Sequence, residues 1–311
     1  MSLAHIHLLL NHFPIIGTII GLGLLVLAIL MKSDHLKHAS LLVLLFIAII
    51  AFPTYLSGNA AEEQIRHLPG VSKELVQAHQ DSALLSFMFM EIAGGFAWLG
   101  LWRYRRIGCM TRGNTTMVLV LTVITVILMS ITGNTGGDIR HPELANDMKM
   151  GPGVGLPSAA IGAFVNGSSG IRWAWATCET LHFVGLCVLF GVVFLVNLRM
   201  LGMMKSISFA TVHRLLPWGV LGFGLNLFTG MLFFVAAPGQ YDKNVAFDWK
   251  IIFIIIAGLN ALYFTLFDET WTLKPGDEAP ARAKFVAVSA AFLWIGVMYF
   301  GSMLPFIGNA F

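Results

Sequence analysis

The sequence predicts an all-α, polytopic membrane protein with eight transmembrane helices in two tandem four-helix bundles. Hydrophobic residues make up 57% of the 311-residue chain and charged residues only 11%, whereas soluble proteins carry about 25% charged residues. The mean hydropathy is +0.79. Eight apolar stretches are each near the ~20 residues that a helix needs to cross a bilayer. They cover residues 3–31, 40–58, 77–102, 115–134, 173–198, 211–236, 249–268 and 283–306.

The first four stretches form the predicted first bundle, residues 1–145. A connection rich in Gly, Pro and Ser follows the fourth stretch, a composition that is typical of loops. We therefore expect a linker at residues 146–172 and a second four-helix bundle at residues 173–311. Trp102, Trp173 and Trp249 lie near predicted helix ends, where aromatic rings settle at the lipid headgroups.

The positive residues predict how the chain crosses the membrane. Most of the 19 Lys and Arg residues lie in the loops after the first, third, fifth and seventh stretches. Cytoplasmic loops are enriched in Lys and Arg, so both termini are expected in the periplasm of a bacterial inner membrane. The net charge of +3, spread over so much apolar mass, does not suggest nucleic acid binding.

The two halves carry a matching helix opening. His12-Phe13 and His182-Phe183 each lie within a long apolar run, and Gly21 and Gly191 follow them at equal spacing. An imidazole is costly in lipid unless a partner holds it. Repeated histidines in helix bundles point to a metal or haem. The chain has no Cys-x-x-Cys-His motif, so any haem would be held non-covalently.

His12 and His79 form the preferred pair of haem ligands. They lie on the first and third helices, which are diagonal in an up-down bundle, and at similar depth. Two diagonal imidazoles can bind the iron of one haem b from opposite sides. His5 precedes His12 by seven positions and shares its helix face, as a further ligand or a propionate contact. Pro14 loosens the same helix. The alternative to a role at the haem, which we prefer for His5, His7 and His67, is a ring that reaches the headgroups and needs no cofactor.

Other polar residues extend this candidate site. His141 and Arg140 follow Gly136-Gly137 in a predicted loop. His141 is either a ligand or a propionate donor, and a guanidinium such as that of Arg140 matches a propionate carboxylate. The alternative interpretation is an ordinary solvated loop.

In the second half, Glu179 and His182 share a helix face, so that Glu179 is expected to orient the His182 ring. His182 is a candidate metal ligand behind His12 and His79, and His141 is a candidate partner for it. Glu91 lies mid-helix, where an ionisable group suggests proton transfer or contact with a quinone. A protonated, structural role for Glu91 is the alternative.

The first half resembles a family of bacterial four-helix inner-membrane proteins that look like b-type cytochromes. The matching residues are Asn11-His12-Phe13-Pro14, Leu56-Ser57-Gly58, His79 with Asp81, and Gly136-Gly137 to His141, which together span nearly all of residues 5–143. The second half is similar to the membrane part of copper-resistance D proteins. That shorter match runs from Leu181-His182-Phe183-Val184-Gly185 to Leu198-Arg199-Met200-Leu201-Gly202.

These observations favour a membrane b-type cytochrome that passes electrons between a quinol pool and a periplasmic carrier or partner subunit. It would hold one haem b, or two, with a quinone as a further cofactor. It would be part of a larger respiratory complex, as a homo- or hetero-oligomer. Two alternatives remain open: a membrane protein that transports or handles copper, and a cofactor-free subunit that anchors a redox complex.

Overall fold

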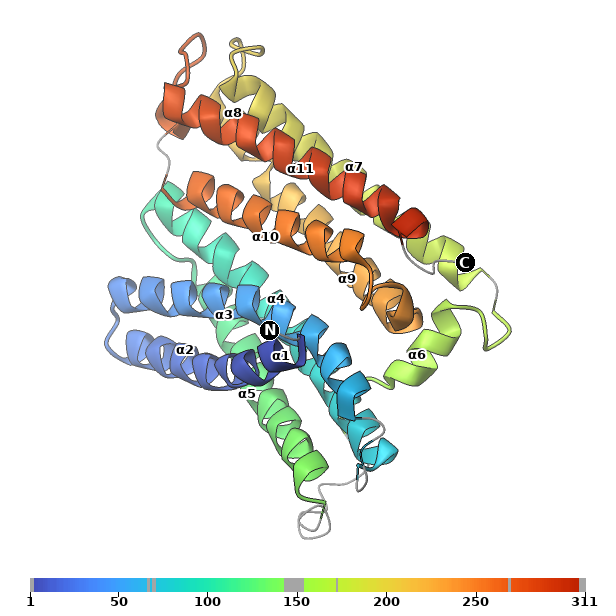
Figure 1. Cartoon of the computed structure of the whole chain (residues 1–311). Helices are drawn as coiled ribbons and strands as arrows, with labels where there is room; N and C mark the ends of the chain where they lie inside the picture. Colours follow the sequence, from blue (N-terminus) through green and yellow to red (C-terminus); the bar gives the residue numbers. More distant parts are fainter. Residues whose placement is uncertain are drawn as a thin grey trace. The chain divides into compact units, whose positions relative to one another are not determined.

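The structure, a computed structural model, describes residues 3–65, 68, 71–142, 154–171, 173–267 and 270–307. Within these residues the chain is all-helical, with no strand (Figure 1). Eight helical segments are long and apolar enough to cross a membrane, which confirms the predicted all-α fold with eight candidate spans. Most of the predicted linker before residue 154 lies outside the described residues.

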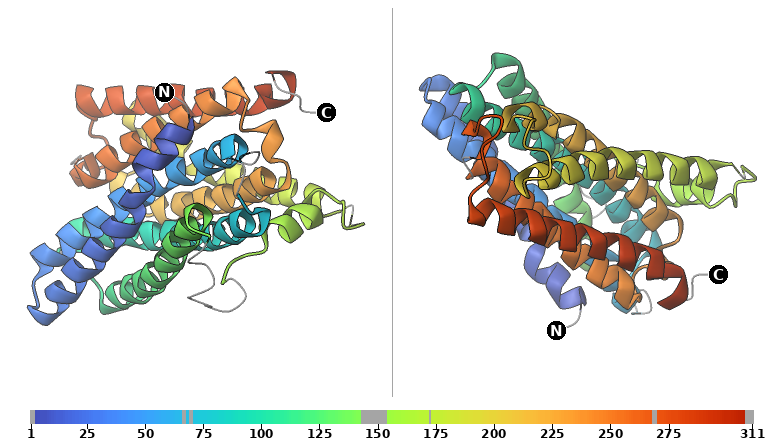
Figure 2. Two further views of the ribbon diagram at one scale, coloured as in Figure 1. Left: turned by 60° about the horizontal axis from the view of Figure 1, so that its bottom comes forward. Right: turned by 90° about the horizontal axis from the view of Figure 1, so that it is seen from above.

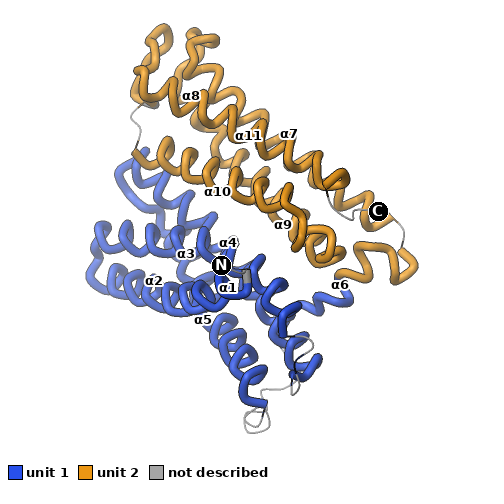
Figure 3. The backbone as a smooth tube through the Cα atoms, viewed as in Figure 1, with its two compact units in different colours: residues 1–161 blue, residues 162–311 orange. Residues whose placement is uncertain are grey.

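The chain divides into two compact units, residues 1–161 and 162–311 (Figure 3). The helices of the first unit are α1 (Leu3–Leu10), α2 (His12–Leu30), α3 (Asp34–Ile65), α4 (Lys73–Ile107) and α5 (Arg112–Arg140), and the boundary falls within α6 (Ser158–Val165). Helix α2 packs against α3 and α5, and α4 packs against the same two helices (Figure 2). The four long helices therefore close on one another, while α1 packs mainly on α3.

The second unit contains α7 (Ala174–Met200), α8 (Phe209–His213), α9 (Leu216–Ala236), η1 (Pro238–Gln240), α10 (Val245–Leu266), η2 (Thr270–Thr272) and α11 (Ala281–Ile307). Helix α7 packs against α9 and α11, and α10 packs on α11. Its apolar core centres on Val192, Val196 and Met200 of α7.

Two of the predicted helices are interrupted, each four residues before a proline. Helix α1 ends at Leu10, four residues before Pro14, and α8 ends at His213, four residues before Pro217. Proline has no N–H for the carbonyl four residues earlier, and its ring clashes with that carbonyl. Residues 3–31 and 211–236 are therefore not single unbroken helices as the sequence predicted.

Small residues bring the helices of the first unit close together. A Cβ added at Gly17 would collide with Ile47 of α3, and one added at Gly94 of α4 would collide with Ala48. A Cβ at Gly21 would lie 2.5 Å from a methyl of Leu44. Because lipid supplies no hydrophobic drive between helices, such close packing is a main source of their association.

In the second unit, the buried side chain of Arg199 joins two loops to the end of α7. Its guanidinium donates hydrogen bonds to the carbonyl oxygens of Ile207, Lys274 and Asp277, the last at 3.2 Å. It also lies 4.2 Å from the centre of the Phe209 ring. Arg199 is fully buried, so these carbonyls and the ring replace the water that a guanidinium normally binds.

Arg199→Met is expected to lower the free energy of unfolding by about 2–4 kcal/mol, because it removes several charge-assisted hydrogen bonds from a buried site. The exposed Arg214 provides the control, Arg214→Met, which should change stability little. Thermal unfolding of the purified protein in detergent measures both. Equal midpoints for the two variants would contradict this role for Arg199.

Candidate functional site

The ring of His7, on α1, is held by α3. Its Nδ1 lies 2.9 Å from the backbone oxygen of Thr54 and 3.4 Å from the hydroxyl of Ser57. A Cβ added at Gly58 would lie 3.3 Å from the ring, so the glycine allows this close approach. Because a carbonyl oxygen can only accept a hydrogen bond, Nδ1 carries the proton.

His79, near the start of α4, is held by α5 in the same way. Its Nδ1 donates to the backbone oxygen of Thr132 at 3.1 Å and lies 3.3 Å from the hydroxyl of Thr135. Gly136 lies beside the ring, where an added Cβ would come within 3.1 Å of Cε1. The side chain is half-buried.

The second unit repeats this arrangement at His182 of α7. The His182 Nδ1 lies 2.8 Å from the hydroxyl of Thr229 on α9. That hydroxyl donates its own proton to the backbone oxygen of Leu225 at 2.7 Å, so it accepts from Nδ1. Gly230 follows Thr229 and lies beside the ring, and Phe233 contacts the ring edge-on at 5.7 Å between centroids.

All three rings therefore share one tautomer, with the proton on Nδ1. With the proton on Nδ1, a neutral imidazole keeps its lone pair on Nε2. A hydrogen bond from the other ring nitrogen to a carbonyl or hydroxyl is the usual way in which a protein orients a metal-binding histidine. His7, His79 and His182 are thus oriented as nitrogen ligands.

His7 and His79 both lie at one end of the first unit, and the pairing of His79 with His12 stays a prediction. His7 contacts the last third of α3 and His79 the last turns of α5, so both rings are at the end of the unit where α2 starts and α3 ends. The His12 side chain is exposed. Helix α1, which ends four residues before Pro14, packs mainly on α3.

The same break corrects the expectation for His5. His5 and His12 were expected on one helix face, but they lie on different helices, α1 and α2. The His5 side chain is exposed. Its predicted role as a ligand or propionate contact stays a prediction.

Gly136 to Arg140, predicted as a loop, form the last turns of α5. Glycine is a poor helix former, but packing of Gly136 against the His79 ring favours the helix here. Arg140 and His141 are both exposed at the end of α5. They lie at the same end of the unit as His79. Their contacts with a propionate stay a prediction.

The predicted role of Glu179 in orienting His182 is taken by another residue. Glu179 is exposed on α7, whereas Thr229 makes the Nδ1 contact. The signal in the sequence was the Thr229-Gly230 pair, which parallels Ser57-Gly58 beside His7 and Thr135-Gly136 beside His79.

Glu91 lies near the middle of α4, as predicted. Its Oε1 is buried and makes no hydrogen bond with the residues that the structure describes. Nothing else distinguishes its surroundings, so proton transfer and quinone contact remain predictions.

Asp81 ties the long connection to α4, two residues beyond His79. Its carboxylate accepts hydrogen bonds from the backbone N–H of Ser158 at 2.9 Å, the hydroxyl of Ser158 at 2.6 Å and the amide of Gln77 at 2.7 Å. The backbone oxygen of Asp81 accepts from Leu156. Residues 154–158 are therefore fixed beside the end of α4 that carries His79.

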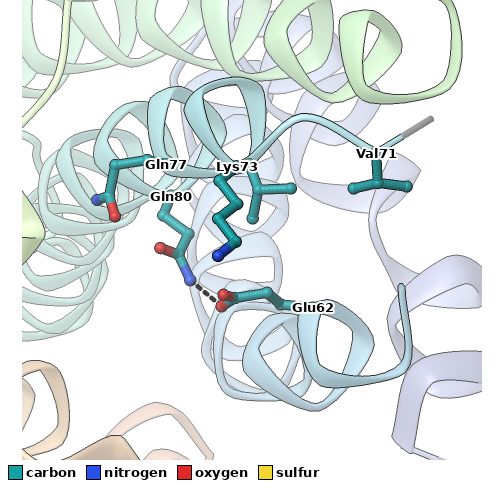
Figure 4. A pocket seen from close by; sticks show the side chains of 6 residues that line it. Glu62, Val71, Lys73, Gln77 and Gln80 are labelled. Atoms are coloured by element: carbon teal, nitrogen blue, oxygen red, sulfur yellow. Dashed lines mark hydrogen bonds between the residues drawn. The ribbon is translucent and has the colours of Figure 1, made fainter. Parts of the chain in front are cut away.

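A cavity of about 260 Å³ lies between the end of α3 and the start of α4. Figure 4 shows Gln80 donating a hydrogen bond to Glu62 across it, with Lys73 pointing to the same side. Its lining residues are Glu62, Val71, Lys73, Val76, Gln77 and Gln80. Four of the six lining residues are polar, and none of the three oriented histidines is among them.

The comparisons with known proteins concern the first unit. Residues 4–142 match a protein family described as predicted membrane protein (DUF2231), and this segment includes His7 and His79. No curated protein and no solved structure matches the chain. The family description supports a membrane protein and carries no activity.

Gly136→Val is expected to lower the free energy of unfolding by about 1–3 kcal/mol, because the new side chain would overpack the site against the His79 ring. Gly137 provides a matched control, since nothing lies within 4 Å of a Cβ added there. Gly137→Val should therefore change stability by less than about 0.5 kcal/mol. Thermal unfolding in detergent distinguishes the two, and equal effects would contradict the contact.

Glu91→Leu is expected to leave stability unchanged or to raise it by about 1 kcal/mol, because a buried oxygen without a hydrogen bond is replaced by an apolar group. The measurement is the unfolding midpoint in lipid nanodiscs. A loss of several degrees would show that Glu91 has a structural partner.

Proposed function

We propose that this multi-pass membrane protein is a b-type haem protein whose axial ligands in the first unit are His7 and His79. The observation that carries the proposal is the shared state of the two rings. Each holds its Nδ1 proton toward a backbone oxygen of a neighbouring helix, and each keeps Nε2 as a lone-pair donor.

The residues present fit a haem better than a bare metal ion. Among the described residues, no group of three His, Cys, Asp or Glu side chains converges as metal ligands. A porphyrin supplies four nitrogens itself, so the protein needs to supply only one or two imidazoles. Gly58 and Gly136 leave the space that the two rings occupy, so they fix where the rings lie.

The haem, when bound, would supply one-electron transfer. The chain's own residues would set the conditions for it. The hydrogen bonds at Nδ1 fix the ring orientations and raise the basicity of Nε2. Arg140 and His141, at the same end of the unit, are the candidate partners of the propionates.

Within this proposal the protein passes electrons between a quinol pool and a periplasmic carrier or partner subunit. It would lie in a bacterial inner membrane with both termini in the periplasm, as the positive residues predict. His182 has the same oriented state as His7 and His79, which favours it as the ligand of a second haem.

The test is the reduced-minus-oxidised spectrum and the pyridine haemochrome of the purified protein. His79→Ala and His7→Ala are each expected to lower the haem-to-protein ratio of the first unit at least tenfold, because each removes an axial ligand. His12→Ala and the exposed His35→Ala should retain the wild-type spectrum.

The four variants separate the alternatives. If His12→Ala removes the haem and His7→Ala does not, the pairing predicted from the sequence is correct and ours is wrong. If the wild-type protein shows no b-type band after expression with haem supplied, the proposal fails, and a cofactor-free anchor subunit becomes the better account.

A further inference from the structure

Lys250 is a cation on the inner side of a membrane-spanning helix. On α10 the exposed stripe runs through Trp249, Ile252 and Ile256, whereas Ala246 and Ala257 are buried. Lys250 lies one helical turn after Ala246 and two turns before Ala257, so it belongs to the buried stripe. It is the sixth residue of α10 and therefore lies in the first two turns of the helix.

The stem of Lys250 packs on α11 at Gly301. A Cβ added at Gly301 would lie 3.4 Å from Nζ and 3.6 Å from Cε. The glycine therefore leaves the space in which the ammonium lies. No hydrogen bond or ion pair joins Lys250 to another residue in the described part of the chain, and the nearby Asp248 is exposed.

His182 adds a second polar group at the same end of the unit. Its ring lies in the first turns of α7 and is held by Thr229 of α9. The first turns of α7 and α10 and the last turns of α9 and α11 meet at one end of the unit. Lys250 and His182 therefore lie at the same end of the second unit, and within the described residues no hydrogen bond or ion pair joins either of them to a carboxylate.

A cation inside a membrane protein is costly unless an anion accompanies it. We propose that Lys250, with His182 at the same end of the unit, forms a binding site for the oxyanion of an amphipathic ligand. The oxyanion is either the phosphate of an anionic phospholipid or a carboxylate of haem. The second source rests on the proposed function, whereas the first is independent of it.

The experiment uses the full-length protein in detergent, with phosphatidylglycerol and phosphatidylcholine as probes in native mass spectrometry. Lys250→Met is expected to weaken retention of phosphatidylglycerol at least tenfold and to leave phosphatidylcholine unchanged. The haem-to-protein ratio is measured on the same samples. Lys284→Met provides the control, because Lys284 lies at the other end of α11 in an exposed ion pair with Glu278.

Two further variants guard against misfolding. Lys250→Arg keeps the charge and should retain the ligand, whereas Gly301→Val keeps the lysine but fills its space and should lose it. Loss of phosphatidylglycerol alone identifies a phospholipid, and loss of haem alone identifies a propionate. If Lys250→Met matches Lys284→Met in both measurements, the proposal is wrong, whether or not the wild-type protein holds haem.

Discussion

The missing N–H of Pro14 determines what the first unit can do. It ends α1 at Leu10 and frees that short helix to pack on α3. His7 then reaches the backbone of α3 at Thr54.

The oriented histidines show how a membrane protein can prepare a nitrogen ligand without a charged partner. A carboxylate would orient an imidazole but would itself need solvation in lipid. Here the acceptors are backbone oxygens for His7 and His79 and the Thr229 hydroxyl for His182, with a glycine beside each ring. Neutral acceptors on a neighbouring helix perform the same task at lower cost, and they also join the helices in pairs.

Composition and stretch length predicted the eight candidate spans, because apolar length is what a bilayer requires. Which of His7 and His12 lies on the inner side of the first unit could not be predicted in this way. Helix α2 is apolar on every side, so periodicity cannot distinguish its inner face from its outer face. The same holds for α10, so the position of Lys250 on its inner side could not be predicted from the sequence. The sequence does contain a hydroxyl residue followed by glycine beside each ring. This pair indicates a contact with histidine only when the position of the opposing histidine is known.

The lengths of α3 and α4 have a consequence for exchange with soluble proteins. At 32 and 35 residues, with 1.5 Å per residue, they extend about 48 and 52 Å, well beyond the ~30 Å of hydrocarbon. Unless the helices tilt strongly, their polar ends, with Glu62 and Gln80, extend past the hydrocarbon. Under the proposed function, a soluble carrier docked on these ends would approach a haem bound at His79, which lies about two turns from the start of α4.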